Sequence, residues 1–194
     1  MEKEPLVRFM QQYVSASPET LAHMVAPFEE RVFAKHDWLL KAGSVCNEYL
    51  FLSEGCLRAF THDPDGNEVT TSFFTGPGVA FDASSFFMRT VSMENIQALT
   101  ESRGFVATFD QINTLFHTIP EFREFGRSML VREFALFKQR TLRLINQTAE
   151  ERYTDLMNQK RAVFQHAQLK QIASYLGVTD SSLSRIRREF AHRH

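Results

Sequence analysis

The sequence contains few cysteines, almost no net charge and no long apolar run. Its 194 residues include two cysteines, Cys46 and Cys56, which are too few to form a metal site by themselves. No apolar segment reaches the length of a membrane-spanning helix, and the N-terminal residues MEKEPLVRF contain no signal-peptide core. We therefore expect a cytoplasmic protein that has no membrane partner and whose thiols are reduced.

Sequence signatures of catalysis are missing too. The sequence contains no H-E-x-x-H zinc motif, no nucleophile motif and no glycine-rich phosphate loop. A metal enzyme on a β-barrel would need clustered histidines and a carboxylate, whereas His36 and His62 are isolated in the sequence. We therefore expect neither an enzyme nor a metal site.

Abundant phenylalanine and an uneven charge distribution are the positive features of the composition. The 19 phenylalanines indicate aromatic packing of the kind found in small β-barrels and between helices. Residues 161–194 contain six Lys or Arg and two acidic residues, so this segment carries +4 and the rest of the chain −5. A basic terminus on an acidic body is expected where only that terminus contacts phosphate, although a solvated helix face would have the same charge.

Residues 32–109 have the pattern of an antiparallel β-domain. Short extended segments alternate with turn signals, of which residues 62–67 (HDPDGN) are the strongest, because proline fixes φ and Gly or Asn accept positive φ. Many short strands at this spacing favour a closed barrel or a jelly roll.

Two strand pairs are predicted within this domain. We expect residues 49–52 and 57–61 to form a hairpin with Gly55 at its turn. The last strand pair is expected at residues 95–99 and 104–109.

Short helices flank the β-domain. Ser17 followed by Pro18 is a helix start signal, so residues 18–26 are predicted to be helical, after an earlier helix at residues 5–16. On the other side of the β-domain, residues 110–118 are expected to form a helix with Asp110 as its N-cap.

Pro120 begins a long helical segment that continues to about Asn146. Several of its apolar residues follow one another at alternating intervals of four and three positions, which is the spacing of a heptad-like seam along one face of a helix. The seam consists of Leu130, Phe134, Phe137, Thr141 and Leu144. A second stripe, Met129, Leu136 and Ile145, is expected to pack on the β-domain. A helix that is apolar on two faces needs two partners, and the same helix of a second subunit is the simplest partner for the seam. Burial of both faces within one subunit is the alternative.

The C-terminal part has the pattern of a helix-turn-helix. Residues 148–151 (TAEE) are a capping box, so a helix is expected from there to about Gln159. Residues 169–190 (LKQIASYLGVTDSSLSRIRREF) predict two more helices, with Gly177 at the turn and Thr179 as the cap of the second. The expected core residues are Ile172, Ala173, Leu176, Leu183 and Ile186. The second helix of such a motif can lie in the major groove of DNA, and an ordinary helical hairpin is the alternative.

The order of these parts and several local motifs resemble the Crp/Fnr family of bacterial transcription regulators. The segments that carry the resemblance are residues 50–58 (LFLSEGCLR), 65–69 (DGNEV), 76–78 (GPG), 149–152 (AEER) and 172–185 (IASYLGVTDSSLSR). Together they extend over nearly the whole chain.

The resemblance implies an α+β fold in three parts. Residues 1–118 are expected to form a sensory domain, a double-stranded β-helix or jelly roll of the cyclic-nucleotide-binding type. Residues 119–147 then form a dimerisation helix, and residues 148–194 a winged-helix-like domain. The resemblance also implies a homodimer, double-stranded DNA as the partner and RNA polymerase as a candidate partner.

The segment that would bind a cyclic phosphate departs from the family pattern. Nucleotide-binding members have F-x-G-E and, after a gap, R-[ST]-A, whose counterparts here are residues 79–86 (VAFDASSF) and 92–98 (SMENIQA). Phe81 stands at the glycine position, Asp82 at the glutamate and Ser92 at the phosphate-binding arginine. Ser92 lacks the charge and the planar fork that suit a cyclic phosphate.

We therefore do not expect ordinary cAMP binding, although a cyclic nucleotide is the cofactor that the resemblance suggests. The alternatives are a pocket for another small effector or a pocket filled by side chains. The candidate pocket residues are Phe81, Asp82, Ala83, Arg89, Ser92 and Met93.

The second helix of the helix-turn-helix also departs from the family pattern. Asp180 and Ser181 stand where the best-known members have Arg-Glu, and Arg185 stands at their later arginine. Because arginine can contact guanine through two hydrogen bonds, Arg185 is the main candidate for reading bases. The other candidate DNA contacts are Thr179, Ser181 and Ser182, with Arg187 and Arg188 on phosphates.

The sequence as a whole predicts a dimeric transcription regulator controlled by a small effector. The chain ends four residues after Phe190, so no wing is expected after the recognition helix. A small-molecule sensor that acts through protein contacts, without binding DNA, is the alternative.

Overall fold

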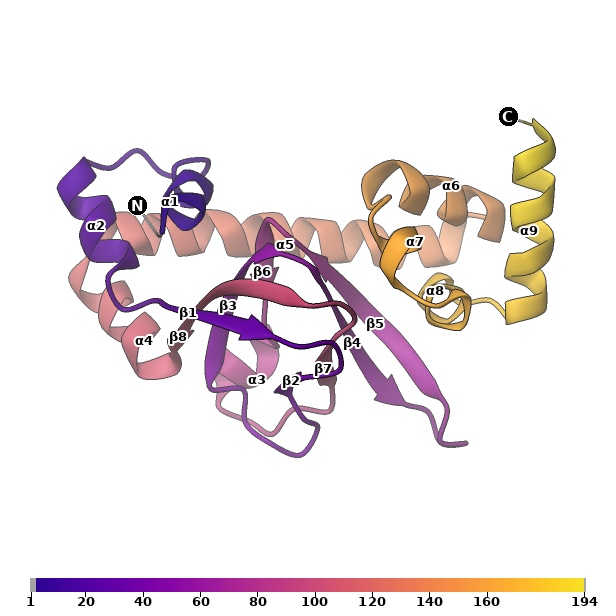
Figure 1. The fold of residues 1–194 in the computed structure, drawn as a ribbon, viewed down its shortest axis with the longest axis horizontal. Helices are drawn as coiled ribbons and strands as arrows, with labels where there is room; N and C mark the ends of the chain where they lie inside the picture. The colour runs from indigo at the N-terminus through magenta and orange to yellow at the C-terminus, as the bar shows by residue number, and fades with distance from the viewer. Residues whose placement is uncertain (1–2, 194) are drawn as a thin grey trace.

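In the computed structural model, which describes residues 3–193, eight short strands form two four-stranded antiparallel sheets (Figure 1). Sheet A contains, in spatial order, β1 (Glu29–Phe33), β8 (Ser102–Thr108), β3 (Glu48–Glu54) and β6 (Gly78–Ala80). Sheet B contains β2 (Trp38–Leu40), β7 (Asn95–Ala98), β4 (Cys56–His62) and β5 (Glu68–Thr75). The two sheets form a jelly roll, so the predicted fold class is confirmed.

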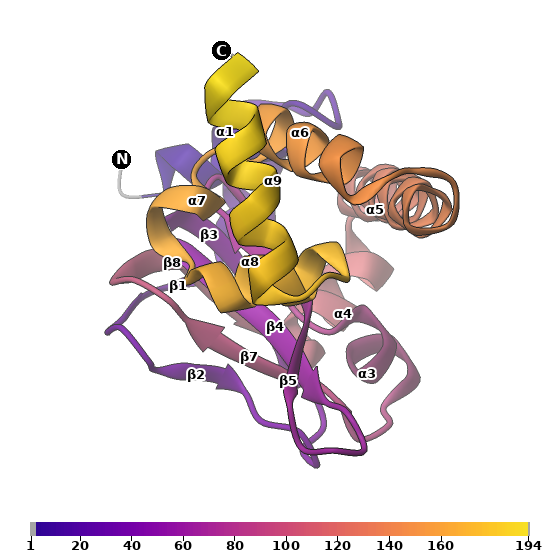
Figure 2. The same ribbon diagram turned by 90° about the vertical axis from the view of Figure 1, so that its right-hand side faces the viewer.

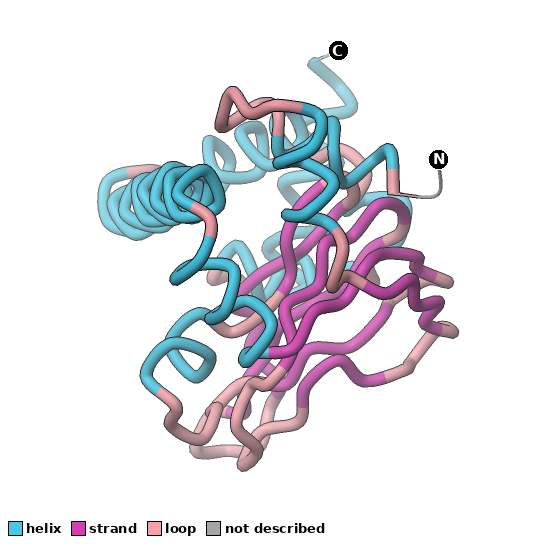
Figure 3. The backbone as a smooth tube through the Cα atoms, turned by 90° about the vertical axis from the view of Figure 1, so that its left-hand side faces the viewer, coloured by secondary structure: helices cyan, strands magenta, loops and turns pink. Residues whose placement is uncertain are grey.

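Helices precede, interrupt and follow this jelly roll. They are α1 (Glu4–Met10), α2 (Pro18–Val25), α3 (Ala83–Met88), α4 (Phe109–Thr118), α5 (Pro120–Asn146), α6 (Ala149–Gln159), α7 (Val163–His166), α8 (Leu169–Leu176) and α9 (Asp180–Arg193). The long helix α5 extends from α1, α2 and α4 at one end of the molecule, past the sheets, to α6–α9 at the other end (Figure 1). Seen along α5, the helix lies to one side of the sheets (Figure 3). None of the helices within residues 3–193 is both long and apolar enough to cross a membrane.

Capping side chains set most of the helix ends that the sequence predicts. Ser17 Oγ accepts a hydrogen bond from Thr20 N at 3.1 Å, which starts α2. The Thr148–Glu151 capping box is present at α6. Two predictions are wrong in detail. Helix α1 ends at Met10, and α4 begins one residue earlier than expected. Its N-cap is Thr108, because Gln111 completes a capping box with it, and Asp110 therefore lies within the first turn.

The predicted hairpin at Gly55 is wrong, because β3 and β4 lie in different sheets. Strand β3 pairs with β6 and β8 in sheet A, whereas β4 pairs with β5 and β7 in sheet B. A single residue between two strands is too short for a hairpin loop. Gly55, at φ +101°, instead turns the chain from one sheet to the other. The same holds for the last predicted pair, since β7 belongs to sheet B and β8 to sheet A.

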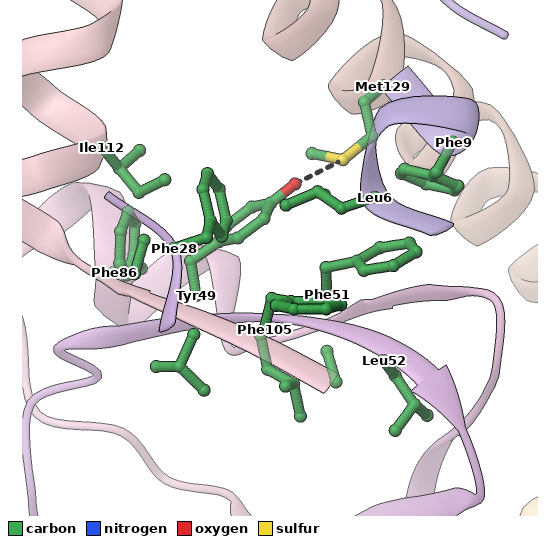
Figure 4. Packing of buried hydrophobic residues seen from close by; sticks show 14 of the residues in the cluster. Leu6, Phe9, Phe28, Tyr49, Phe51, Leu52, Phe86, Phe105, Ile112 and Met129 are labelled. Atoms are coloured by element: carbon green, nitrogen blue, oxygen red, sulfur yellow. Dashed lines mark hydrogen bonds between the residues drawn. The ribbon is translucent and has the colours of Figure 1, made fainter. Parts of the chain in front are cut away.

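Aromatic side chains fill the main core, as the phenylalanine content suggests. The ring of Phe51 packs against Phe9 and Phe105, with centroids 4.9 and 6.4 Å apart. Tyr49 reaches from β3 to α5, where its hydroxyl donates to Met129 Sδ at 3.0 Å (Figure 4). Complete burial raises the pKa of the Tyr49 phenol, so this group stays neutral. These contacts fix the first half of α5 to the jelly roll.

A second core joins the C-terminal helices to sheet B. Buried side chains of α6, α7, α8 and α9 form one cluster together with Cys56, Phe73 and Leu99 of the jelly roll. Burial raises the pKa of the Cys56 thiol to about 11, so it stays protonated at neutral pH. The C-terminal helices are thus packed against the sheet.

We expect Gly55→Ala to destabilise the fold more than Gly66→Ala does. Both glycines have positive φ, +101° and +82°, so both substitutions carry a backbone cost of about 1–2 kcal/mol. At Gly55 a Cβ would also lie 2.3 Å from Ser102 Oγ and 2.7 Å from Ser102 Cα, whereas nothing lies within 4 Å at Gly66. This overpacking should add about 1–3 kcal/mol to the loss, measured by urea unfolding. An equal loss of unfolding free energy in the two variants would contradict the close approach of Gly55 to Ser102.

Candidate functional site

Helices α8 and α9 form the predicted helix-turn-helix. All five predicted core residues, Ile172, Ala173, Leu176, Leu183 and Ile186, are buried. Gly177 adopts φ +67° after α8, and Val178 N donates to Ala173 O at 3.0 Å, which closes the helix end. Thr179 Oγ1 accepts from Ser182 N at 3.3 Å, which caps α9 as predicted.

The exposed face of α9 carries three of the predicted DNA-contacting side chains. With 3.6 residues per turn, Ser181, Arg185 and Arg188 lie on the face opposite Leu183 and Ile186, and all three are exposed. The Arg185 side chain is 68% exposed and its only partner among the described residues is Glu189, with 3.5 Å between Nη1 and Oε1. An exposed pair of this length is weak, so the guanidinium is available to another acceptor.

The other predicted DNA contacts lie at the edges of this face. The hydroxyls of Ser181 and Ser182 both hydrogen-bond to Thr179 Oγ1, at 3.1 and 2.9 Å. These three hydroxyl groups therefore form one cluster at the start of α9. Arg187 is exposed too, but it lies on the flank of the helix, apart from Arg185.

Strand β5 is the surface on which α8 is seated (Figure 2). Thr70 N donates to Ser174 Oγ at 2.8 Å, and that hydroxyl lies 3.3 Å from Glu68 O. The rings of Phe73 and Tyr175 pack with their centroids 5.1 Å apart. The position of the helix-turn-helix is therefore fixed relative to sheet B.

Arg140 of α5, which the sequence analysis did not select, connects three elements. Its Nη1 donates to Thr71 O of β5 at 2.5 Å and its Nη2 to Tyr175 O of α8 at 3.4 Å. Its guanidinium also lies 4.2 Å from the centre of the Tyr175 ring. No local motif marks this residue, because its partners come from segments distant in the sequence.

Side chains of the predicted effector segment bond to one another and pack into the core. Asp82 caps α3 through Oδ1, and its Oδ2 accepts from Ser92 Oγ at 2.6 Å. The ring of Phe81 packs on Tyr49 and Phe86, with centroids 4.9 and 5.4 Å apart. Glu94 lies nearby and its burial raises the pKa of its carboxyl group. Of the six predicted pocket residues, the structure thus brings Phe81, Asp82 and Ser92 together.

The remaining three predicted pocket residues point elsewhere or lie at the surface. The Arg89 guanidinium is not bonded to Phe81, Asp82 or Ser92: it donates to Cys46 O at 3.0 Å and to Phe86 O at 3.3 Å, contacts Asn47 Oδ1 and stacks on the ring of Phe109 at 4.0 Å. Ala83 is exposed, and Met93 is 79% exposed. Within residues 3–193 the hydrogen bonds of Ser92 Oγ join it to Asp82 and to the main chain of Glu94, and none joins it to an arginine.

Most of the predicted seam of α5 is exposed in the described part of the chain, and only Leu130 packs against the main core. Phe134 and Phe137 are 68% and 64% exposed, Thr141 and Leu144 are exposed, and Leu130 is half-buried. The second predicted stripe is correct at Met129, which is buried, and wrong at Leu136 and Ile145, which are exposed. The reason is that only the first half of α5 is packed into the aromatic core.

The region between α5 and the C-terminal helices contains a groove that the sequence analysis missed. The groove holds about 180 Å³ and its walls come from β5, α5, α6 and α8, with Lys160 just beyond α6. Four cationic side chains and two carboxylates line it. Among residues 3–193 no group of three or more His, Cys, Asp or Glu side chains is placed to hold a metal ion.

Comparisons with known proteins agree with this architecture. Residues 30–118 match the family model of the cyclic nucleotide-binding domain. No curated protein matches the sequence. Several solved structures of similar fold are transcription regulators.

FixK2 of Bradyrhizobium japonicum superposes with a TM-score of 0.72 at 16% identity, over 86% of this chain and 85% of that one. A putative transcriptional regulator of the Crp/Fnr family from Eubacterium rectale superposes with a TM-score of 0.70 at 13% identity, over 100% of this chain and 89% of that one. The c-di-GMP-responsive regulator CLP of Xanthomonas campestris superposes with a TM-score of 0.69 at 12% identity, over 91% of this chain and 93% of that one. Residues 30–118 therefore match the cyclic nucleotide-binding domain family, and the chain as a whole has the fold of these solved structures.

Proposed function

We propose that this protein is a homodimeric DNA-binding transcription regulator whose N-terminal domain is sensory. The observation that carries the proposal is the exposed face of α9, where Ser181, Arg185 and Arg188 stand opposite the buried core of the helix-turn-helix. A helix that presents arginine and serine in this way has the chemistry to enter the major groove and contact guanine and phosphate. The excess of four positive charges in residues 161–194 supports the same partner.

Within this proposal the side chains have different roles. Arg185 reads a base, because it lies in the middle of the exposed face and its link to Glu189 is weak. Arg187, Arg188 and the hydroxyl cluster of Thr179, Ser181 and Ser182 contact phosphates and set the position of the helix on the duplex. The fold shared with transcription regulators supports this assignment.

The seam of α5 is proposed as the dimer interface. Beyond Leu130 it presents an exposed, mostly apolar row of four-and-three spacing, which suits the same row of a second copy. Two helix-turn-helix units related by a two-fold axis would then read two half-sites.

Arg185→Ala is expected to lower affinity for the cognate site by about 1–3 kcal/mol and to relax base preference at one position of each half-site. Arg188→Ala should weaken binding to all sequences alike and reduce the salt dependence, because it removes a phosphate contact. Mobility shifts on a selected site and on scrambled DNA, at several salt concentrations, measure both effects.

The matched control for these variants is Arg127→Ala, which removes an exposed arginine of α5 that is paired with Glu124. This control should bind like wild type. Unchanged binding by Arg185→Ala would contradict its base-reading role. The absence of any DNA binding at low salt would favour a sensor that acts through protein contacts.

Phe134→Glu is expected to convert the dimer to a monomer of 22.4 kDa, because it places a charge within the apolar seam. Leu142→Glu is the control, since Leu142 is exposed on the same helix but outside the seam. Analytical ultracentrifugation of both variants measures the mass. A dimer that survives Phe134→Glu would show that another surface joins the subunits.

Calorimetric titration with cAMP and cGMP is expected to show no saturable binding. Ser92 and Asp82 are hydrogen-bonded to each other, and the Arg89 guanidinium is bonded to Cys46 O and packed on Phe109, so neither Ser92 nor Arg89 offers a free cation to a cyclic phosphate. A control titration with Ser92→Arg tests whether the lost arginine is the missing element. Micromolar affinity of the wild-type protein for either nucleotide would overturn this interpretation.

A further inference from the structure

We propose that the groove between α5, α6, α8 and β5 is a binding site for a small organic anion, a carboxylate or sulfonate carried on an apolar body. The binding itself is independent of the proposed function, and only its consequence for regulation rests on that function. Nothing in the family model assigns this region, which lies outside residues 30–118 except for β5.

Three cations of the groove have no carboxylate partner at hydrogen-bond distance within residues 3–193. Arg140 donates to Thr71 O and Tyr175 O, Arg152 to Leu176 O and Gln147 O, and Lys160 to Phe73 O. Every one of these acceptors is a main-chain carbonyl, so the bonds orient the cations but do not neutralise them. Each side chain also keeps further N–H groups for another acceptor.

The remaining charges of the groove leave an excess of two positive charges. Arg143 Nε is paired with Asp155 Oδ2 at 3.4 Å. Glu133 is the one other carboxylate in the lining, and it opposes the three cations without a hydrogen bond to any of them. Lys160 is largely buried, and its burial lowers the pKa of its ammonium group. A bound anion would offset that desolvation, so charge complementarity favours an anionic ligand.

The other walls of the groove are apolar, and they indicate that the ligand has an apolar body beside its acidic group. Leu136, Phe137 and Leu144 of α5 stand on one side, and all three are exposed in the single chain. Leu156 of α6 and the Tyr175 ring of α8 stand on the other. A ligand with an aromatic or aliphatic body would cover these surfaces while its acidic group meets the cations.

The position of the groove connects it to the helix-turn-helix. Tyr175 and Leu176 are the last residues of α8, directly before the turn at Gly177. Two of the cations, Arg140 and Arg152, hold the carbonyls of these same two residues. An anion that binds the two guanidinium groups would compete with these carbonyls and would therefore change how firmly α8 is held against β5 and α5. The segment around Ser92 offers no comparable free cations, because its side chains bond and pack with one another.

The test compares 1-anilinonaphthalene-8-sulfonate with N-phenyl-1-naphthylamine, which has the same aromatic body without the sulfonate. Fluorescence titration of the full chain should show that the sulfonate probe binds roughly tenfold more tightly, since one charge-assisted contact supplies about that factor. Lys160→Gln should weaken the sulfonate probe severalfold, and Glu133→Gln should strengthen it severalfold. Neither variant should change the affinity for the neutral probe.

Matched controls separate the groove from general charge effects. Arg187→Gln removes a positive charge from the exposed flank of α9, and Glu19→Gln removes a negative charge from the exposed surface of α2. Both should bind the two probes like wild type. A partly unfolded variant would bind both probes more strongly through exposed apolar surface, so unchanged affinity for the neutral probe and a wild-type thermal unfolding transition are required of each variant. Glu133→Gln, which should strengthen only the sulfonate probe, carries the test if Lys160→Gln fails to fold.

Equal affinity for the two probes, or a sulfonate affinity that neither groove variant changes, would overturn the site. The probe titration needs no DNA. A failure of the proposed DNA binding would therefore appear in the mobility shifts alone, and a failure of the anion site would appear in the titration alone.

Discussion

The seating of α8 on the edge of sheet B is the interaction on which the rest of the structure depends. Strand β5 is the last strand of that sheet, so one side of its main chain has no neighbouring strand. Side chains from the C-terminal half of the molecule occupy this edge: Ser174 bonds Thr70 N and Glu68 O, Arg140 bonds Thr71 O, and Lys160 bonds Phe73 O. Unpaired main-chain groups on a buried edge would each cost about 1–3 kcal/mol. The same contacts therefore protect the sheet edge and determine where α8 and the following helix α9 lie.

The long helix α5 has two halves with different physical environments. In its first half Phe122, Phe125 and Met129 are buried in the aromatic core, and burial of each such side chain contributes about 1.5–3 kcal/mol. Beyond Leu130 the apolar side chains are exposed, and Arg140 bonds the helix to both β5 and α8. The first half thus anchors the helix in the jelly roll. The second half, with its exposed seam, is free to meet a second copy, a ligand or both.

Local sequence signals predicted the elements well, because most of them are decided within a few residues. Ser17, Thr148 and Thr179 cap their helices through side chains that act on main-chain groups three residues away. Strand pairing is different, since Gly55 is a turn residue in a hairpin and in a crossing between sheets alike. The candidate site divides in the same way. The face of α9 follows from helical spacing, whereas the groove needs Arg140, Arg152 and Lys160 to be brought together with β5 by packing. No sequence pattern within a single segment predicts that these residues come together.

Phe137 and Leu144 belong both to the seam of α5 and to the wall of the groove. The two faces are adjacent on the helix, because the seam and the groove-lining residues are separated by about a quarter turn. A second copy packed along the seam would restrict the rotamers of these two side chains, and a ligand in the groove would contact the same side chains from the other side. Dimer geometry and groove occupancy are then coupled through shared atoms, and such coupling is reciprocal: whatever a ligand does to the subunit interface, the interface does to ligand affinity. Since the groove also includes the end of α8, the two copies of α9 in the proposed dimer would respond together.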